Sequence, residues 1–343
     1  MPVGSPHAIL TILPLPMIVM LTSTDVALIK LLADGRFHSG TDLGHTLGIS
    51  RAAVWQRLKR LQAQGLRLRA TPGRGYRLSQ PLDLLDPERI LSQLPERYCE
   101  QLQCLEVWPQ LASTNQYLRD QQAQLNGVRV VLAESQTAGR GRAGRAWSSP
   151  FAANIYLSLA VAFEHGGAQL SSLSLALAVA VVDTLQAHGI TGAGIKWPND
   201  ILVDGKKIAG ILVEISGQLH AQAEVIIGVG LNVCMPDDIS LDQPWTDIAS
   251  EGGTVCRNQV AASLIGGLLS VCASYRAGDT QPWVARWREL DLSYDRPLRL
   301  LLNDQVIVGI GKGVDPQGML LVEHDGELKR YASGDVSLRI AHG

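Results

Sequence analysis

Residues 134–147 read ESQTAGRGRAGRAW, and this stretch is the most informative part of the chain. It alternates three arginines with three glycines: Arg140, Arg142 and Arg145 with Gly139, Gly141 and Gly144. Glycine loses more conformational freedom on folding than any other residue, so we expect a loop that stays mobile until a ligand fills it. Guanidinium groups bind phosphates and carboxylates through paired hydrogen bonds, which predicts an anionic ligand.

The sequence lacks the common nucleotide-binding motifs. No GxxxxGKS or GxxxxGKT run occurs, and Gly228-Val-Gly230 is followed by residues that continue as a strand instead of opening a Rossmann helix. An ordinary kinase or dinucleotide enzyme is therefore unsupported. Glycine–arginine runs also occur in RNA-binding segments, but a single copy between two expected strands is weak support for that alternative.

Two later segments supply further cations and a predicted bend, and we consider them together with this loop. Residues 196–200 read KWPND, and residues 206–214 read KKIAGILVE. Pro198 restricts its own φ and the residue before it, which predicts a stiff turn at a strand end. Ala209 and Gly210 are small enough to let another group approach the backbone. Loop arginines and strand lysines suit a reaction between two anions, such as a carboxylate attacking the α-phosphate of ATP, where catalysis is mainly positioning and charge neutralisation.

Charge is distributed unevenly along the chain, although the net charge is only −2. Residues 21–80 contain ten Lys and Arg against three Asp, a balance of +7. Residues 1–20 carry no charged side chain, so residues 81–343 hold the other 20 basic and 29 acidic residues, a balance of −9. A basic module joined to an acidic body predicts a part that binds a polyanion.

The basic segment has the pattern of three helices and a hairpin. Apolar spacing and glycine stops predict helices over 24–35, 41–47 and 51–64 and strands over 66–70 and 76–78. We expect Thr24 or Asp25 to cap the first helix and Ser50 the third. This order is typical of a winged helix-turn-helix.

The third helix and the hairpin tip carry the expected DNA contacts. Burial of the apolar stripe would leave the basic residues of the helix largely free, with N-terminal residues facing base edges and the others facing phosphates. The candidates are Ser50, Arg51, Gln56, Arg57, Lys59, Arg60 and Arg74. The alternative is a solvated basic helix in a module that binds proteins.

The rest of the chain divides by composition. We expect an apolar extension over 1–23, the winged helix-turn-helix over 24–80, a linker with a short helix over 81–104, an α+β domain over 105–292 and a small β barrel over 293–343. Prolines interrupt the extension, which is also short for a spanning helix, so a membrane anchor is the minority interpretation. Five scattered cysteines show no zinc spacing, as in a cytoplasmic protein with reduced thiols.

The motifs GRGRxGR, KWPND and KxAGILVE, in this order, resemble those of bifunctional bacterial biotin–protein ligases that also repress the biotin operon. The resemblance covers about residues 24–340. It implies an N-terminal winged helix-turn-helix, a class II synthetase-like α/β ligase domain and a C-terminal SH3-like β barrel. Lipoate ligases share the catalytic fold but are not expected to carry this set of motifs.

The resemblance also implies roles for matching residues. Biotin would be bound by Ser113, Thr114, Asn115, Gln136, Arg140, Gly141, Arg142 and Lys207. ATP and the adenylate would be bound by Gly139, Arg140, Arg142, Arg145, Trp147, Asn199, Asn232 and Trp245. The catalytic set would be Arg142, Lys207, Lys196 and Asp200, the last two flanking the phosphates or Mg²⁺. Ser113 also fits a plain helix cap, and Trp245 a surface anchor. Ala143 stands where related repressors carry another arginine, which bears on how well the loop retains the adenylate.

The implied function has two parts. Biotin and MgATP would give biotinyl-5′-AMP, from which biotin passes to one lysine of a biotin carboxyl carrier protein, such as that of acetyl-CoA carboxylase. The adenylate would also favour a homodimer that binds operator DNA and represses biotin synthesis genes, in the cytoplasm. The alternative is a transcription factor whose second domain only senses a ligand. That alternative leaves the cations of residues 134–214 unexplained.

Overall fold

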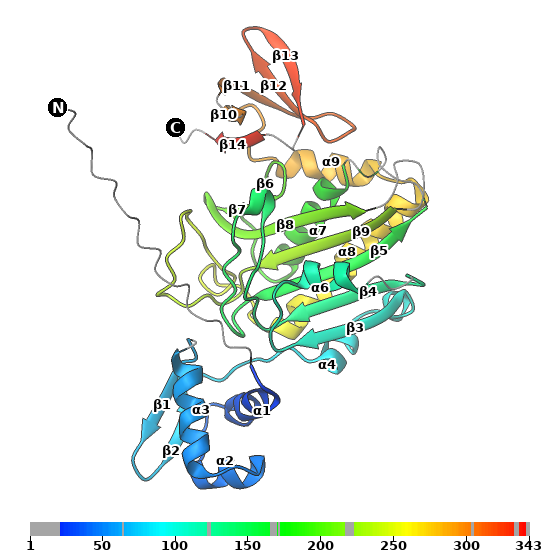
Figure 1. Cartoon of the computed structure of the whole chain (residues 1–343). Coiled ribbons are helices and arrows are strands. Elements are labelled where there is room, and N and C mark those ends of the chain that lie inside the picture. Colours follow the sequence, from blue (N-terminus) through cyan, green and yellow to red (C-terminus); the bar gives the residue numbers. More distant parts are fainter. Residues whose placement is uncertain are drawn as a thin grey trace, which may run out of the picture.

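The computed structural model describes residues 21–63, 65–121, 125–164, 170, 172–216, 223–302, 305–332 and 336–340. The expected N-terminal extension lies almost wholly outside the described residues. The chain forms an N-terminal helical module, a central sheet covered by helices and a C-terminal antiparallel sheet (Figure 1).

The N-terminal module contains three helices and a two-stranded antiparallel hairpin: α1 (Ser23–Leu32), α2 (Gly40–Leu47), α3 (Arg51–Ala63), β1 (Leu68–Thr71) and β2 (Gly75–Leu78). Its own apolar core includes Leu28, Val54 and Leu58. The prediction that Thr24 or Asp25 caps α1 is wrong. Thr22 is the cap: its hydroxyl accepts from the Asp25 N–H at 3.2 Å, and the Asp25 carboxylate accepts from the Thr22 N–H at 2.9 Å. This reciprocal pair satisfies two N–H groups that the helix itself leaves open.

The central part is a mixed seven-stranded sheet in the order β3-β4-β5-β9-β8-β7-β6. Its strands are β3 (Leu102–Trp108), β4 (Val128–Ala133), β5 (Ile155–Phe163), β6 (Ala193–Lys196), β7 (Asp200–Val203), β8 (Lys206–Ser216) and β9 (Ala223–Leu231). Only the β3–β4 pair is parallel, and β6 to β9 follow one another as antiparallel neighbours, as expected for hairpin connections. The sequence did not indicate β7, and the KWPND segment forms the tight turn between β6 and β7.

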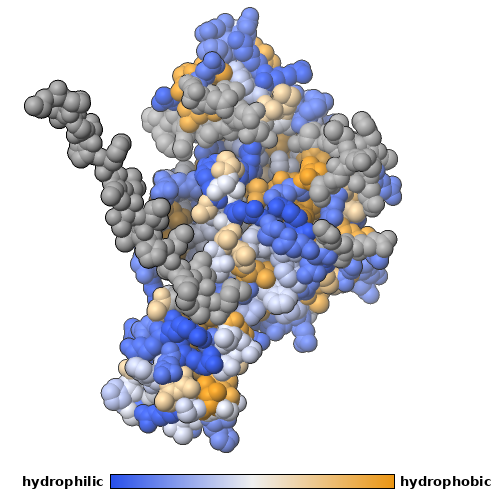
Figure 2. Space-filling view, viewed as in Figure 1, coloured by the Kyte–Doolittle hydropathy of each residue, from blue (hydrophilic) through white to orange (hydrophobic). Residues whose placement is uncertain are grey.

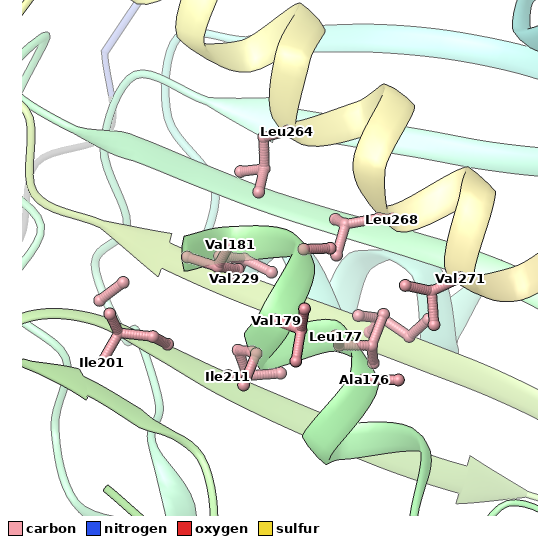
Figure 3. Close-up of a cluster of buried hydrophobic side chains, with 14 of the residues drawn as sticks. Ala176, Leu177, Val179, Val181, Ile201, Ile211, Val229, Leu264, Leu268 and Val271 are labelled. Atoms are coloured by element: carbon pink, nitrogen blue, oxygen red, sulfur yellow. The ribbon is translucent and has the colours of Figure 1, made fainter. Parts of the chain in front are cut away.

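Helices cover the sheet. The helices of this region are α4 (Pro87–Leu91), α5 (Glu96–Cys99), α6 (Thr114–Asp120), α7 (Leu173–Ala187), α8 (Arg257–Ala277) and α9 (Gln281–Leu290). The helix α6 contacts β4, β5 and β9, whereas α7 contacts β6, β7 and β8 and also packs on α8 and α9 (Figure 1). The apolar side chains of α7, α8 and the sheet interdigitate, for example Val179, Leu268 and Val229 (Figure 3).

The helix α8 is strongly apolar because it is part of this core. Among the described residues it is the one helix long and apolar enough to cross a membrane, yet 61% of its most apolar window is buried inside the protein. Burial against α7 and β5 accounts for that composition, because buried helices are apolar on most of their faces.

The C-terminal part is a five-stranded antiparallel sheet in the order β13-β12-β11-β10-β14. Its strands are β10 (Pro297–Leu302), β11 (Gln305–Val314), β12 (Leu320–His324), β13 (Glu327–Tyr331) and β14 (Val336–Ile340). A hydrogen bond from the Trp197 indole N–H to the Gly318 carbonyl, 3.1 Å long, ties this sheet to the end of β6.

Candidate active site

One cleft of about 510 Å³ gathers most of the expected site residues. It is lined by the start of α6, the glycine–arginine loop, the β6–β7 turn, β8, β9 and the segment 240–245. The expected residues in its lining are Ser113, Thr114, Asn115, Gln136, Arg140, Gly141, Arg142, Arg145, Trp147, Asn199, Asp200, Lys207, Asn232 and Trp245. Gly139 and Lys196 lie outside the lining.

The floor of the cleft is a polar network at the start of α6. The Gln136 side-chain oxygen accepts from the Thr114 N–H at 2.9 Å and from the Thr114 hydroxyl at 3.2 Å. The Ser158 hydroxyl lies 2.7 Å from the Thr114 hydroxyl and within hydrogen-bonding distance of the Asn115 side-chain oxygen. The Asn115 amide donates to Glu214 at 2.8 Å. Each side chain is thus held in one orientation, which pre-organises donors and acceptors for a polar ligand group.

Sequence reasoning missed Ser158 and Glu214. Ser158 is fully buried on β5, whose other residues are apolar or aromatic. A single serine in a buried strand was therefore the available signal. Glu214 ends the quoted KxAGILVE motif and reaches Asn115 across the sheet face. Ser113 is the N-cap of α6, which confirms the expectation that it caps a helix.

Trp147 forms one wall of the cleft, and two glycines make room for it. A Cβ on Gly230 would lie 2.3 Å from the indole ring, and a Cβ on Gly210 would lie 3.1 Å from it. The prediction that the small residue at 210 admits a close neighbour is confirmed, and the neighbours are the Trp147 ring and the Lys207 side chain. The Lys207 ammonium lies 5.2 Å from the centroid of the same ring, a cation–π contact.

Cations outnumber carboxylates in this part of the cleft. Lys207 Nζ lies 2.6 Å from Asp200 Oδ1. Burial lowers the pKa of Arg142 from its ordinary value, the neighbouring Asp200 carboxylate opposes that lowering, and the nearby Arg145 adds to it. The guanidinium group of arginine stays charged in proteins, so Arg142 remains a cation at neutral pH. The lining of the cleft thus holds four cations, Arg140, Arg142, Arg145 and Lys207, against the two carboxylates of Asp200 and Asp242. This excess of positive charge suits an anionic ligand.

The glycine–arginine loop is folded on itself. The Gly141 N–H donates to the Arg145 carbonyl at 2.7 Å, and Ala143 adopts a positive φ of 54° within a single 3-10 turn. Arg140 donates to the Gln116 side-chain oxygen at 2.7 Å, which links the loop to α6. Gly139 is packed behind the loop, where a Cβ would lie 2.7 Å from the Trp147 carbonyl.

Two asparagines of the expected adenylate set are bound to backbone. The Asn199 amide donates to the Ile211 carbonyl and so holds the β6–β7 turn against β8. The buried Asn232 amide donates to the Thr246 carbonyl at 3.0 Å. Trp245 lies at the edge of the cleft because its segment pairs with Lys207 in an isolated bridge.

The expectation that the Arg57 and Arg60 side chains are largely free is wrong, and their contact with DNA stays a prediction. Both guanidinium groups bind the fully buried carboxylate of Asp25, Arg57 at 2.9 Å from Oδ1 and Arg60 at Oδ2. A buried carboxylate requires charged or hydrogen-bonding partners, and these two arginines supply them. Ser50 caps α3 as expected, since the Ala53 N–H donates to its hydroxyl at 3.1 Å. Arg74 lies over the ring of Phe37, 4.3 Å from the centroid.

Comparison with known proteins identifies the class. Residues 107–232 match the biotin/lipoate A/B protein ligase family, residues 26–77 match an HTH domain and residues 295–339 match the biotin protein ligase C-terminal domain. The bifunctional ligase/repressor BirA of Salmonella typhimurium is 41% identical over 93% of this chain and 99% of its own length. The chain therefore belongs to the family of biotin protein ligases that carry a helix-turn-helix module.

Two further relatives match a smaller share of this chain. The biotin–[acetyl-CoA-carboxylase] ligase of Mycobacterium tuberculosis is 37% identical over 68% of this chain and 88% of its own length. The biotin protein ligase of Aquifex aeolicus, solved in complex with biotin and ATP, is similar in structure with a TM-score of 0.60 and 25% identity, over 70% of this chain and 100% of that chain.

Proposed function

We propose that the protein activates biotin with ATP to biotinyl-5′-AMP and transfers the biotin to a lysine of a biotin carboxyl carrier protein. The observation that carries this proposal is the single cleft in which a fixed polar floor lies next to Lys207, Arg142 and Arg145. A biotin-sized ligand needs both parts, because its ureido ring presents hydrogen-bonding groups and its other end is a carboxylate. Relatives named as ligases across most of the chain support the same reaction.

The first step joins two anions. Ser113, Thr114, Asn115 and Gln136 bind the ureido ring, and Arg140, Gly141 and Arg142 close over the carboxylate and the α-phosphate. A carboxylate oxygen attacks the α-phosphorus, and pyrophosphate leaves. Lys207 and Arg142 neutralise the charge that builds up at the reacting phosphate, while Arg145, Trp147, Asn199, Asn232 and Trp245 hold the nucleotide. Removal of one such electrostatic contact typically slows a reaction by about 100- to 1,000-fold.

The second step transfers the acyl group. The ε-amine of the carrier lysine attacks the carbonyl carbon of the mixed anhydride, and AMP leaves with the bonding electrons. The amine must lose one proton, and Asp200 is the proposed acceptor because its carboxylate lines the cleft. Lys196 would act from the adjacent strand end on the phosphates.

Magnesium fits the cleft as a partner of the phosphates. Within the described ranges, no cluster of three His, Cys, Asp or Glu side chains could hold a metal ion by itself. Mg²⁺ usually keeps several waters and binds through one or two carboxylates and the substrate phosphates. Asp200 and Asp242 are the carboxylates in the lining and would supply that contact. The ion would neutralise phosphate charge.

The N-terminal module gives the protein its second role, as a biotin-responsive repressor in the cytoplasm. Two relatives that cover 93% and 92% of this chain are named ligase/repressors, and residues 26–77 match an HTH domain. The β1–β2 hairpin serves as the wing, and the C-terminal sheet closes as an SH3-like barrel. Binding of the adenylate orders the glycine–arginine loop and favours a homodimer with higher affinity for operator DNA. Such coupling requires that the ligand bind the dimer-competent state more tightly.

The first experiment is transfer of labelled biotin, with MgATP, onto a purified biotin carrier domain. We expect ATP-dependent labelling by the wild-type protein and a loss of about 100-fold or more in adenylate formation by Lys207→Ala. Arg142→Ala should form the adenylate slowly or release it. Lys206→Ala is the matched control, since Lys206 precedes Lys207 on β8 but is exposed outside the cleft. Near-normal rates in both cleft variants would contradict the assignment, and binding of biotin without transfer would favour a sensor.

A further inference from the structure

The solvent-facing side of α3 differs from the one expected from the sequence. With Val54, Leu58 and Leu61 buried, the exposed positions of this helix are Arg51, Ala52, Trp55, Gln56, Lys59, Gln62 and Ala63. They recur at spacings of three and four residues and so form one stripe along the helix. Arg57 and Arg60 lie beside this stripe and are bound to Asp25. The stripe therefore presents Trp55 together with Arg51, Gln56 and Lys59, which the sequence suggested.

Trp55 is the largest side chain of the stripe. Half of it is exposed (50%), and Lys59, one helical turn later, places its ammonium 5.9 Å from the centroid of the ring. Large aromatic side chains are usually mostly buried, so an indole on an open helix face calls for a partner. Ala52 lies one turn before it and leaves space for an approaching surface.

Charge around the stripe favours a polyanionic partner. The helix α3 contains no acidic residue. Of the three acids in residues 21–80, Asp25 is bound to two arginines and Asp34 lies 2.9 Å from His38. Among the described residues, no carboxylate lies within ion-pair distance of Arg51, Lys59 or Arg74, and the N-terminal module presents mostly hydrophilic residues on the face shown in Figure 2. Basic side chains around an exposed helix stripe match the negative potential of DNA.

We propose that Trp55 contacts the C5-methyl groups of thymines in the major groove and so helps to select the operator sequence. This inference rests on the proposed DNA-binding function and adds a residue that determines base preference. The thymine methyl is the apolar group that the major groove exposes, and an indole edge can bury it. Gln56, next on the stripe, has the amide that can pair with adenine N6 and N7, while Arg51 at the start of the stripe and Lys59 one turn after Trp55 supply positive charge for phosphates.

The test starts from selection of a DNA sequence by the protein itself. The full-length protein, with biotin and MgATP, is used to enrich duplexes from a random-sequence DNA library, and affinity for the enriched duplex is then measured with each thymine replaced in turn by deoxyuracil. This replacement removes only the methyl group. For the wild-type protein we expect a loss of about fourfold at one or two thymines, the factor for one buried methylene-sized group. Trp55→Ala should bind the thymine and uracil duplexes equally, and Trp55→Phe should retain part of the difference.

Controls distinguish failure of this inference from failure of the proposed DNA-binding function. Gln62→Ala, exposed on the same helix, should respond to uracil like the wild type. Transfer of biotin by Trp55→Ala should be normal, because Trp55 does not line the cleft. Failure of the wild-type protein to enrich any sequence would overturn the DNA-binding function and this inference together. An unchanged response of Trp55→Ala to uracil would overturn the inference alone. If Trp55→Ala responds to uracil like the wild type but its sedimentation coefficient is changed, Trp55 would instead be assigned to a contact between two copies of this protein.

Discussion

At the scale of single residues, the shape of the cleft depends on positions that have no side chain. Gly210 and Gly230 lie in neighbouring strands, and the Trp147 indole occupies the space above both. Gly228 plays the same part for Asn115, whose side-chain oxygen would lie 2.3 Å from a Cβ there. A side chain at any of these three positions would collide with a residue of the cleft wall or floor.

We therefore predict that Gly230→Ala displaces the Trp147 ring and weakens biotin binding. Forcing an extra methyl against a packed ring typically costs about 1–3 kcal/mol of folding stability, and the displaced indole would enter the space for the ligand. Urea unfolding and calorimetric titration with biotin measure the two effects. Gly192→Ala is the control, because its Cβ would meet its nearest neighbour at an ordinary 3.8 Å. Equal biotin affinity in both variants would show that Trp147 does not border the binding site.

At the scale of elements, one carboxylate joins α1 to α3. Burial by itself would raise the pKa of Asp25, but hydrogen bonds from Thr22, Arg57 and Arg60 outweigh burial and hold the pKa below its ordinary 3.8. The helices of the module thus share a buried charge cluster beside their apolar core. The same cluster holds the Arg57 and Arg60 side chains against Asp25.

This cluster predicts a pH dependence for the N-terminal module. A lowered folded-state pKa means that the stabilisation is fully present above the unfolded-state value of about 3.9 and is lost as the pH falls through the folded-state pKa. Asp25→Asn should lose about 1–3 kcal/mol near neutral pH, as expected when charged donors lose their acceptor, and should show a flatter acid limb. Unfolding of the full chain followed by circular dichroism from about pH 3 to pH 7 tests this. Asp279→Asn, at an exposed carboxylate, should behave like the wild type.

At the scale of the whole molecule, a buried ion pair fastens the connection between the N-terminal module and the central sheet. Arg257, at the start of α8 and only 3% exposed, lies 2.7 Å from Glu134 and donates to the Asp83 carbonyl at 2.9 Å. The Leu85 N–H donates to the same Glu134, and the Asn258 amide donates to the Leu84 carbonyl at 3.0 Å. Residues 83–86 are therefore bound to the first residue of the quoted 134–147 stretch.

Loss of one partner should release this connection. Glu134→Gln leaves the Arg257 charge buried with its carboxylate removed, which typically costs about 3–5 kcal/mol. We expect faster proteolytic cleavage within residues 81–86 and a lower unfolding midpoint for the full chain. Asp183→Asn breaks the exposed pair with Arg286 and should cost less than about 1 kcal/mol. Cleavage at the wild-type rate in Glu134→Gln would show that the apolar contacts alone hold the connection.

Features that depend on neighbouring residues could be predicted from the sequence. Helix caps such as Ser50, apolar spacing in α3 and the order of the three motifs indicated the helix-turn-helix, the cleft loop and the family, because such signals act over a few positions. Only the tertiary structure decided which partners those residues meet. Asp25 binds Arg57 and Arg60, and Gly230 accommodates Trp147, because the folded chain brings together residues that are remote in sequence, where neither periodicity nor spacing carries information about the contact.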